Sequence, residues 1–239
     1  MKTIPALLLL ATTPVLAFAA PMKGQATFTV RIENVSTGAT LKLSNGSTAP
    51  APHSPGAWVV QEKPARLFTP GKLQPGWGLE MQAEDGDPSK LAEHCMHHEG
   101  VRAAGVFNVP QGDDKPGPAL PGKAYEFTVT AKPGDRLAFT TMFGQSNDVF
   151  FAPDEKGIAL FANGRPVSGD VTSQVMLWDA GTEVNEEPGA GPNQAPRQMS
   201  PNTGPSESKP VAKLHDRYTW PRVSDVIRVM ITPSQAASN

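Results

Sequence analysis

The amino-acid sequence predicts an all-β protein, an antiparallel β-sandwich of about seven or eight strands with one short helix and long loops rich in proline and glycine. Three observations support this fold class. Short segments in which apolar and polar residues alternate recur along the 239 residues, and this period is typical of half-buried strands. Turn sequences separate these segments, and the chain contains 22 glycines and 25 prolines. Only one stretch carries the signals of a helix.

Two strands with clear alternation lie near the ends of the predicted domain. In residues 25–35, Phe28, Val30 and Ile32 alternate with polar residues. Residues 225–232 repeat this pattern with isoleucine and valine at alternate positions. Because one face of each segment is apolar, we expect both strands to cover the core of the sandwich.

Three segments in the middle of the chain are also predicted strands. Residues 125–129 and 137–143 flank a tight turn at residues 133–135, and we expect the two strands to form a hairpin. Residues 171–178 form a further strand, which places Asp179 in the loop that follows it.

Two short apolar patches, residues 58–60 and 77–79, lie between prolines. Proline cannot donate a hydrogen bond to a neighbouring strand, so central strands rarely contain it. We therefore expect both patches to be loops packed on the sandwich.

The predicted helix covers residues 88–99. Asp87 is a suitable N-cap, proline is favoured at the first helical position, and Gly100 is a typical terminator. Within this helix, His94 and His98 are one turn apart and can share a transition metal, copper or zinc. The alternative is an ordinary solvated helix face, because few further ligands are local.

The start of the chain has the pattern of an export signal. A positive residue precedes an apolar run over residues 4–16, and an Ala-Phe-Ala sequence matches a cleavage site. We expect residues 1–19 to be a signal peptide, residues 20–233 one sandwich domain, and residues 234–239 a flexible tail. The protein is then exported to the periplasm or secreted, and no apolar run is long enough for a membrane span.

Charge and composition exclude several classes of function. A net charge of −2 and a pI near 6.2 argue against a nucleic-acid surface or a polybasic membrane patch. The only cysteine, Cys95, has no partner for an intramolecular disulfide. The chain has neither Gly-x-Ser-x-Gly nor His-Glu-x-x-His, so we expect no enzyme.

Acidic residues at two points of the chain suggest a metal site. Asp179 and Glu183 are four residues apart, and an extended chain would separate them by roughly 13 Å, too far for one ion. Gly181 lies midway and permits a turn that brings both carboxylates together, with Asp148 as a third ligand from a neighbouring loop. Three hard oxygen ligands suggest calcium. The alternative is that these acids only cap ordinary loops.

The same two points carry a resemblance to a known family. The stretch Gln145-Ser-Asn-Asp-Val-Phe-Phe151 and the later Trp178-Asp-Ala-Gly-Thr-Glu183 resemble the spondin-N (F-spondin) domain family. Its hallmark is Pro-Ser-Pro-Asp-Trp followed by Asp-Ala-Gly-Thr-Asp. The resemblance extends loosely over about residues 25–232, and it is closest to bacterial members that consist of this domain alone.

The resemblance implies a C2-like antiparallel β-sandwich and a Ca²⁺ ion bound by Asp148, Asp179 and Glu183. This chain departs from the hallmark at several positions, which include the following. Asn147 stands for the second proline, Val149 for the tryptophan, and Glu183 for the last aspartate. Glutamate still offers a carboxylate, although its side chain is one methylene longer.

Two functions follow as expectations. The first is an exported, non-catalytic calcium-binding module for adhesion, which recognises an extracellular or cell-surface protein or glycan. Its binding surface is expected in the loops around the ion, including the long Pro/Gly-rich loop 186–210; the alternative for that loop is a solvated spacer. The second function is periplasmic copper or zinc binding through the segment His94–His98, with His94, Cys95, His97 and His98 as the ligands.

Overall fold

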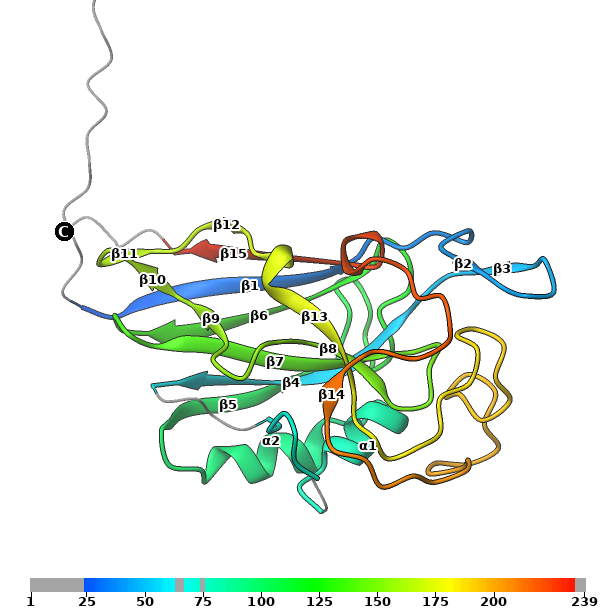
Figure 1. The fold of residues 1–239 in the computed structure, drawn as a ribbon. Helices are drawn as coiled ribbons and strands as arrows, with labels where there is room; N and C mark the ends of the chain where they lie inside the picture. The colour runs from blue at the N-terminus through cyan, green and yellow to red at the C-terminus, as the bar shows by residue number, and fades with distance from the viewer. Residues whose placement is uncertain (1–23, 63–66, 74–75, 235–239) are drawn as a thin grey trace, which may run out of the picture.

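The computed structural model describes residues 24–62, 67–73 and 76–234. It confirms an antiparallel β-sandwich (Figure 1). The two predicted terminal segments, the signal peptide at 1–19 and all but Ser234 of the tail at 234–239, lie outside the described residues. In the described part of the chain, no helix is long and apolar enough to cross a membrane.

The elements in chain order are β1 (Ala26–Asn34), β2 (Leu41–Lys42), β3 (Thr48–Ala49), β4 (His53–Gln61), α1 (Leu79–Glu84), α2 (Ser89–Met96), β5 (Val101–Phe107), β6 (Ala124–Ala131), β7 (Arg136–Phe143), β8 (Val149–Pro153), β9 (Ile158–Ala159), β10 (Phe161–Ala162), β11 (Arg165–Pro166), β12 (Gly169–Asp170), the 3₁₀ turn η1 (Thr172–Gln174), β13 (Val175–Asp179), β14 (Ala212–Lys213), the 3₁₀ turn η2 (Val223–Asp225) and β15 (Ile227–Pro233). Eight of the described strands have five or more residues, as expected.

Two sheets form the sandwich. The first has the strand order β12-β15-β1-β6, and the second has the order β14-β13-β8-β7-β4-β5, with β9 paired to β7. Figure 1 shows the first sheet above the second, with both helices below the second sheet. The helices therefore cover the outer face of the second sheet, a layer that the sequence predicted only in part.

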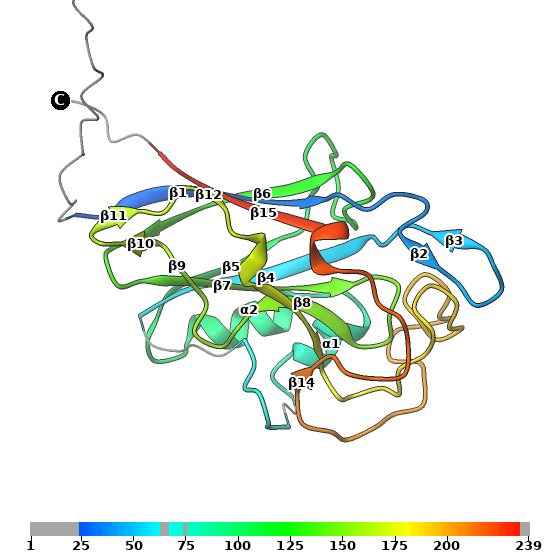
Figure 2. The same cartoon turned by 45° about the horizontal axis from the view of Figure 1, so that its top comes forward.

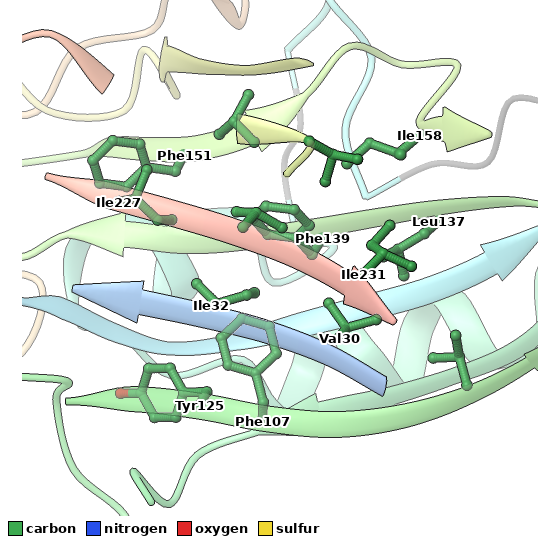
Figure 3. Close-up of a cluster of buried hydrophobic side chains, with 14 of the residues drawn as sticks. Val30, Ile32, Phe107, Tyr125, Leu137, Phe139, Phe151, Ile158, Ile227 and Ile231 are labelled. Atoms are coloured by element: carbon green, nitrogen blue, oxygen red, sulfur yellow. The ribbon is translucent and has the colours of Figure 1, made fainter. Parts of the chain in front are cut away.

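The main core lies between the sheets (Figure 3). The predicted apolar face of β1 is confirmed, because Phe28, Val30 and Ile32 are fully buried. Ile227 and Ile231 of β15 contribute the same kind of side chain from the neighbouring strand. Burial of aliphatic and aromatic side chains on both inner faces is the main stabilising term of such a sandwich.

The predicted hairpin of residues 125–129 and 137–143 is wrong. Both segments are strands, but β6 pairs with β1 in the first sheet and β7 pairs with β4 and β8 in the second. The turn between them is a corner at which the chain changes sheets. In this turn, the Asp135 carboxylate accepts a hydrogen bond from the backbone N–H of Lys132 and forms an ion pair with Arg102. Alternation predicts a strand but not the sheet to which it belongs.

The patch at residues 58–60 was expected in a loop, and this is also wrong. It lies in β4, a central strand between β5 and β7. Proline 55 is tolerated because β4 is irregular there, with a shift of register between His53 and Gly56. Gly56 is required at this point, since a Cβ atom would lie 2.1 Å from the backbone oxygen of Thr140.

The predicted helix at 88–99 corresponds to α2. It begins one residue later than expected, with Pro88 at the N-cap, while the Asp87 carboxylate accepts a 2.9 Å hydrogen bond from the backbone N–H of Ser89. The helix ends at Met96, three residues earlier than expected, and His97 is its C-cap. Gly100 has a φ of 87°, but it lies four residues beyond the last helical residue and is therefore not the terminator.

The second helix, α1, was not predicted, because the patch at 77–79 was assigned to a loop. Leu79 and Ala83 of α1 and Leu91 of α2 pack on a second apolar cluster at the outer face of the sheet, together with Trp178. The views in Figures 1 and 2 both show α1 close to β8. This position brings Glu84 to the candidate site.

Candidate functional site

Two neighbouring strands deliver the acidic residues. Strand β8 begins at Val149, which pairs with Asp179 at the end of β13. The backbone N–H of Ala180 donates a 3.2 Å hydrogen bond to the carbonyl oxygen of Asp148. The turn before β8 and the loop after β13 therefore meet, although they are about thirty residues apart in the chain.

The Asp148 carboxylate is fully buried. Its Oδ2 atom accepts hydrogen bonds from the backbone N–H groups of Thr182, at 2.7 Å, and Glu183, at 3.1 Å. Its Oδ1 atom has no hydrogen-bond partner. Burial, with a further contribution from the charge of Asp179, raises the pKa of Asp148 to about 7.

Glu183 follows in the same loop and is also buried. Its Oε2 atom lies 3.5 Å from the side-chain amide of Asn147, and its Oε1 atom has no partner. Burial raises the pKa of Glu183 to about 7, and the negative charge of Asp148 adds to the shift. Gly204 crosses directly over this carboxylate, since a Cβ atom there would lie 2.8 Å from each of its oxygens.

A third buried carboxylate, that of Glu84, comes from α1. The sequence analysis missed it, because α1 is only six residues long and carries no motif that points to a site. Burial raises the pKa of Glu84 to about 7, and repulsion from Glu183 adds to the shift. Its Oε2 atom is buried without a hydrogen-bond partner.

Asp179 is arranged differently. Trp178 and Ala180 belong to the apolar cluster between the helices and the second sheet. Successive side chains of a strand point to opposite faces of the sheet. Asp179 therefore lies on the face of the second sheet that is turned away from the helices. Its carboxylate accepts hydrogen bonds from the backbone N–H of Gly181, at 2.8 Å, and the side chain of Asn185, at 2.7 Å. It lines a separate cavity of about 490 Å³.

The expected turn at Gly181 is confirmed by a φ of 72°. Of the three acids that the sequence assigns to a metal, the structure brings Asp148 and Glu183 together and adds Glu84. In the described residues, no three side chains of histidine, cysteine, aspartate or glutamate lie close enough to one another to hold a metal ion.

The three buried carboxylates nevertheless have the chemistry of a cation site. Each has one oxygen without a hydrogen-bond partner, and a buried group in this state destabilises the fold unless something satisfies it. Hard oxygens of carboxylates are the ligands that calcium and magnesium prefer. Protonation also removes the negative charge of these carboxylates. Because their pKa values are raised, protons compete with a cation for the three groups.

The long loop 186–210 contains no helix or strand, and it packs back on the site. Its return half runs beside the loop that carries Glu183, because the backbone N–H of Glu207 donates to Thr182 and that of Val184 donates to Pro205. Gln194 is fully buried within it. Asp85, next to Glu84, accepts hydrogen bonds from the loop's Gln198 side chain and Asn202 N–H.

The side chains in this loop form a base and an exposed outer edge. At the base, the Glu186 carboxylate accepts hydrogen bonds from Asn147 and from both the backbone and the side chain of Asn193. At the outer edge, Met199 is 98% exposed, the largest exposure among the large apolar side chains of the described residues. The base of the loop is therefore held by hydrogen bonds, whereas its outer edge is open to solvent.

His94 lies in α2 and His98 lies two residues beyond its end, and their ring centroids are 5.3 Å apart. They line a different cavity from Asp179.

No family model matches this chain, and no curated protein matches it either. The assignment of function therefore depends on the geometry above and on the sequence motifs.

Proposed function

We propose that this protein is an exported, non-catalytic calcium-binding β-sandwich module that recognises a protein or glycan outside the cytoplasm, as its resemblance to spondin-N domains implies. The observation that carries the calcium proposal is the group formed by Glu84, Asp148 and Glu183. All three are buried, and each has an oxygen without a hydrogen-bond partner. Without an ion their negative charges repel one another, and ligation would draw them together.

Calcium fits this group better than magnesium. The carboxylates belong to a helix, a turn and a loop, and their side chains differ in length. Magnesium requires a small octahedral shell, whereas calcium accepts six to eight oxygens in flexible geometry. Asp179, which the resemblance implies as a ligand, stays a prediction; its Oδ2 atom accepts a hydrogen bond from the side chain of Asn185.

Calcium is expected to raise the melting temperature of the metal-stripped protein. At about one hundred times the Kd, binding stabilises the folded state by about 2.7 kcal/mol, or roughly 5–10 °C for a domain of this size. Asp148→Asn should remove this shift, and magnesium should produce a smaller one. Differential scanning calorimetry in calcium and in chelator measures both effects.

The control for this experiment is Asp113→Asn, which changes an aspartate whose partner is the exposed Lys123. This variant should keep the calcium shift. The Asp179→Asn variant decides whether Asp179 is a ligand. Equal melting temperatures of the stripped wild-type protein in calcium and in chelator would refute the calcium proposal.

The recognition surface is expected at the outer edge of the loop 186–210. Met199→Asp should weaken calcium-dependent binding to native envelope fractions about tenfold, since a buried apolar contact contributes about 1–2 kcal/mol. It should leave the calcium shift in melting temperature unchanged. Leu120→Asp is a matched control, because Leu120 is also an exposed apolar residue but lies in another loop. Equal losses in the two variants, or none in either, would mean that this edge is not the recognition surface.

A further inference from the structure

The end of α2 and the turn that follows it carry a pair of imidazoles beside a tryptophan. The rings of His94 and His98 have centroids 5.3 Å apart and an interplanar angle of 66°. The Trp77 ring stacks on His94 with a centroid distance of 5.0 Å and an angle of 15°. A cavity of about 590 Å³ opens beside this pair. The group comes from α2, the turn after α2 and the segment before α1, and it shares no residue with the carboxylate site.

The Nε2 atom of His94 is buried and has no hydrogen-bond partner. A buried imidazole nitrogen without a partner costs free energy, as any unsatisfied polar atom does. Burial, followed by repulsion from His98, lowers the pKa of His94. The neutral imidazole is thereby favoured, and this is the form that binds metals.

The spacing of the two rings fits a shared ion. Zinc-to-nitrogen bonds are about 2.0–2.1 Å, so two imidazoles on one tetrahedral ion have ring centres roughly 5 Å apart. The observed centroid distance of 5.3 Å agrees with this value. His98 lies two residues beyond the end of α2, where its backbone N–H donates a 3.0 Å hydrogen bond to the carbonyl oxygen of Cys95. This turn keeps the His98 ring beside the ring of His94.

We propose that His94 and His98 bind one divalent transition-metal ion, Cu²⁺ in preference to Zn²⁺, with water completing the coordination shell. Copper(II) exceeds zinc in affinity for nitrogen ligands in the Irving–Williams order. Two protein ligands leave open positions, which the adjoining cavity makes accessible to water or to a ligand carried by the metal. The site is independent of the proposed calcium site.

The test is a Cu²⁺ titration of the metal-stripped protein against a competing chelator, followed by tryptophan fluorescence. We expect one equivalent to bind with strong quenching, because Trp77 is in contact with His94. His94→Gln and His98→Gln should each weaken binding about tenfold or more. Electron paramagnetic resonance should show two nitrogen ligands in the wild-type complex and one in each variant.

His97→Gln is the matched control, since His97 lies between the end of α2 and His98 but is exposed, and its ring belongs to neither ring contact of the group. It should bind Cu²⁺ as the wild type does. Trp77→Phe should retain the binding measured by chelator competition and lose most of the quenching. Asp148→Asn should also bind Cu²⁺ normally, which separates this result from the calcium experiment. Unchanged affinity in His94→Gln, or loss of binding in His97→Gln, would overturn the proposed pair.

Discussion

Glu84→Gln is expected to stabilise the metal-free protein at pH 8 by about 1–3 kcal/mol and to remove its response to calcium. In the folded protein the pKa of Glu84 is raised from 4.5 to about 7. The carboxyl therefore binds its proton more tightly in the folded state than in the unfolded state. Its destabilising effect is absent below about pH 4.5, grows as the pH rises, and is complete above about pH 7.

The measurement is urea unfolding of wild type and variant in chelator at pH 5 and pH 8. The stabilisation by Glu84→Gln should shrink at pH 5, because little of the wild-type carboxylate is charged there in the folded state. His53 acts in the opposite direction, since burial lowers its pKa to about 3 and stability falls as the pH drops below about 6.5. Both proteins contain His53, so its effect cancels in the comparison.

Glu93→Gln provides the control, because Glu93 is an exposed glutamate on the neighbouring helix α2. It should change stability little at either pH and should keep the calcium response. With calcium present, wild type should become more stable than Glu84→Gln at pH 8. Equal stability of Glu84→Gln and wild type in chelator at pH 8 would show that the Glu84 carboxylate carries no charge penalty.

Gly181→Ala is expected to lower the free energy of unfolding by more than about 3 kcal/mol, and to disturb the position of Glu183. Gly181 has a φ of 72°, and a left-handed conformation costs an alanine about 1–2 kcal/mol. In addition, a Cβ atom would lie 2.3 Å from the backbone oxygen of Lys209. The loop that carries Glu183 must then separate from the returning half of the loop 186–210, to which it is hydrogen-bonded.

Gly46→Ala separates these two causes. Gly46 has a φ of 85°, but a Cβ atom there would have no neighbour within 4 Å. In this variant the free energy of unfolding should fall only by the cost of the left-handed backbone conformation, about 1–2 kcal/mol. Chemical denaturation of the two variants gives the difference. If Gly181→Ala lowers the free energy of unfolding no more than Gly46→Ala does, the close approach of the Gly181 backbone to Lys209 does not constrain the site.

The sequence predicted strands best where one face is buried and the other is not. Strand β1 shows a strict alternation of buried and partly exposed residues, so its sequence pattern was sufficient. Strand β4 is buried on both faces, by the sandwich core on one side and the helices on the other, and alternation is lost. Its proline then made the segment resemble a loop.

The candidate site was predicted only where its residues adjoin a recognisable motif. Asp148 and Glu183 lie in such motifs, and the turn at Gly181 was expected from glycine's freedom at positive φ. Glu84 is distant in sequence from both acids, and its approach depends on the packing of a helix on a sheet. The direction of Asp179 depends on the pairing of β13 with β8, which local sequence does not determine.

The pairing of β1 also has a consequence for the order in which the protein folds. This strand begins at residue 26 and pairs on one edge with β15, which ends at residue 233. Closing a loop of such length is slow, because chain entropy must be lost before the contacts form. The first sheet can be completed only when nearly the whole chain is available. In a chain that crosses a membrane unfolded, an amino-terminal strand of this kind would lack one neighbour until the final strand had followed it across.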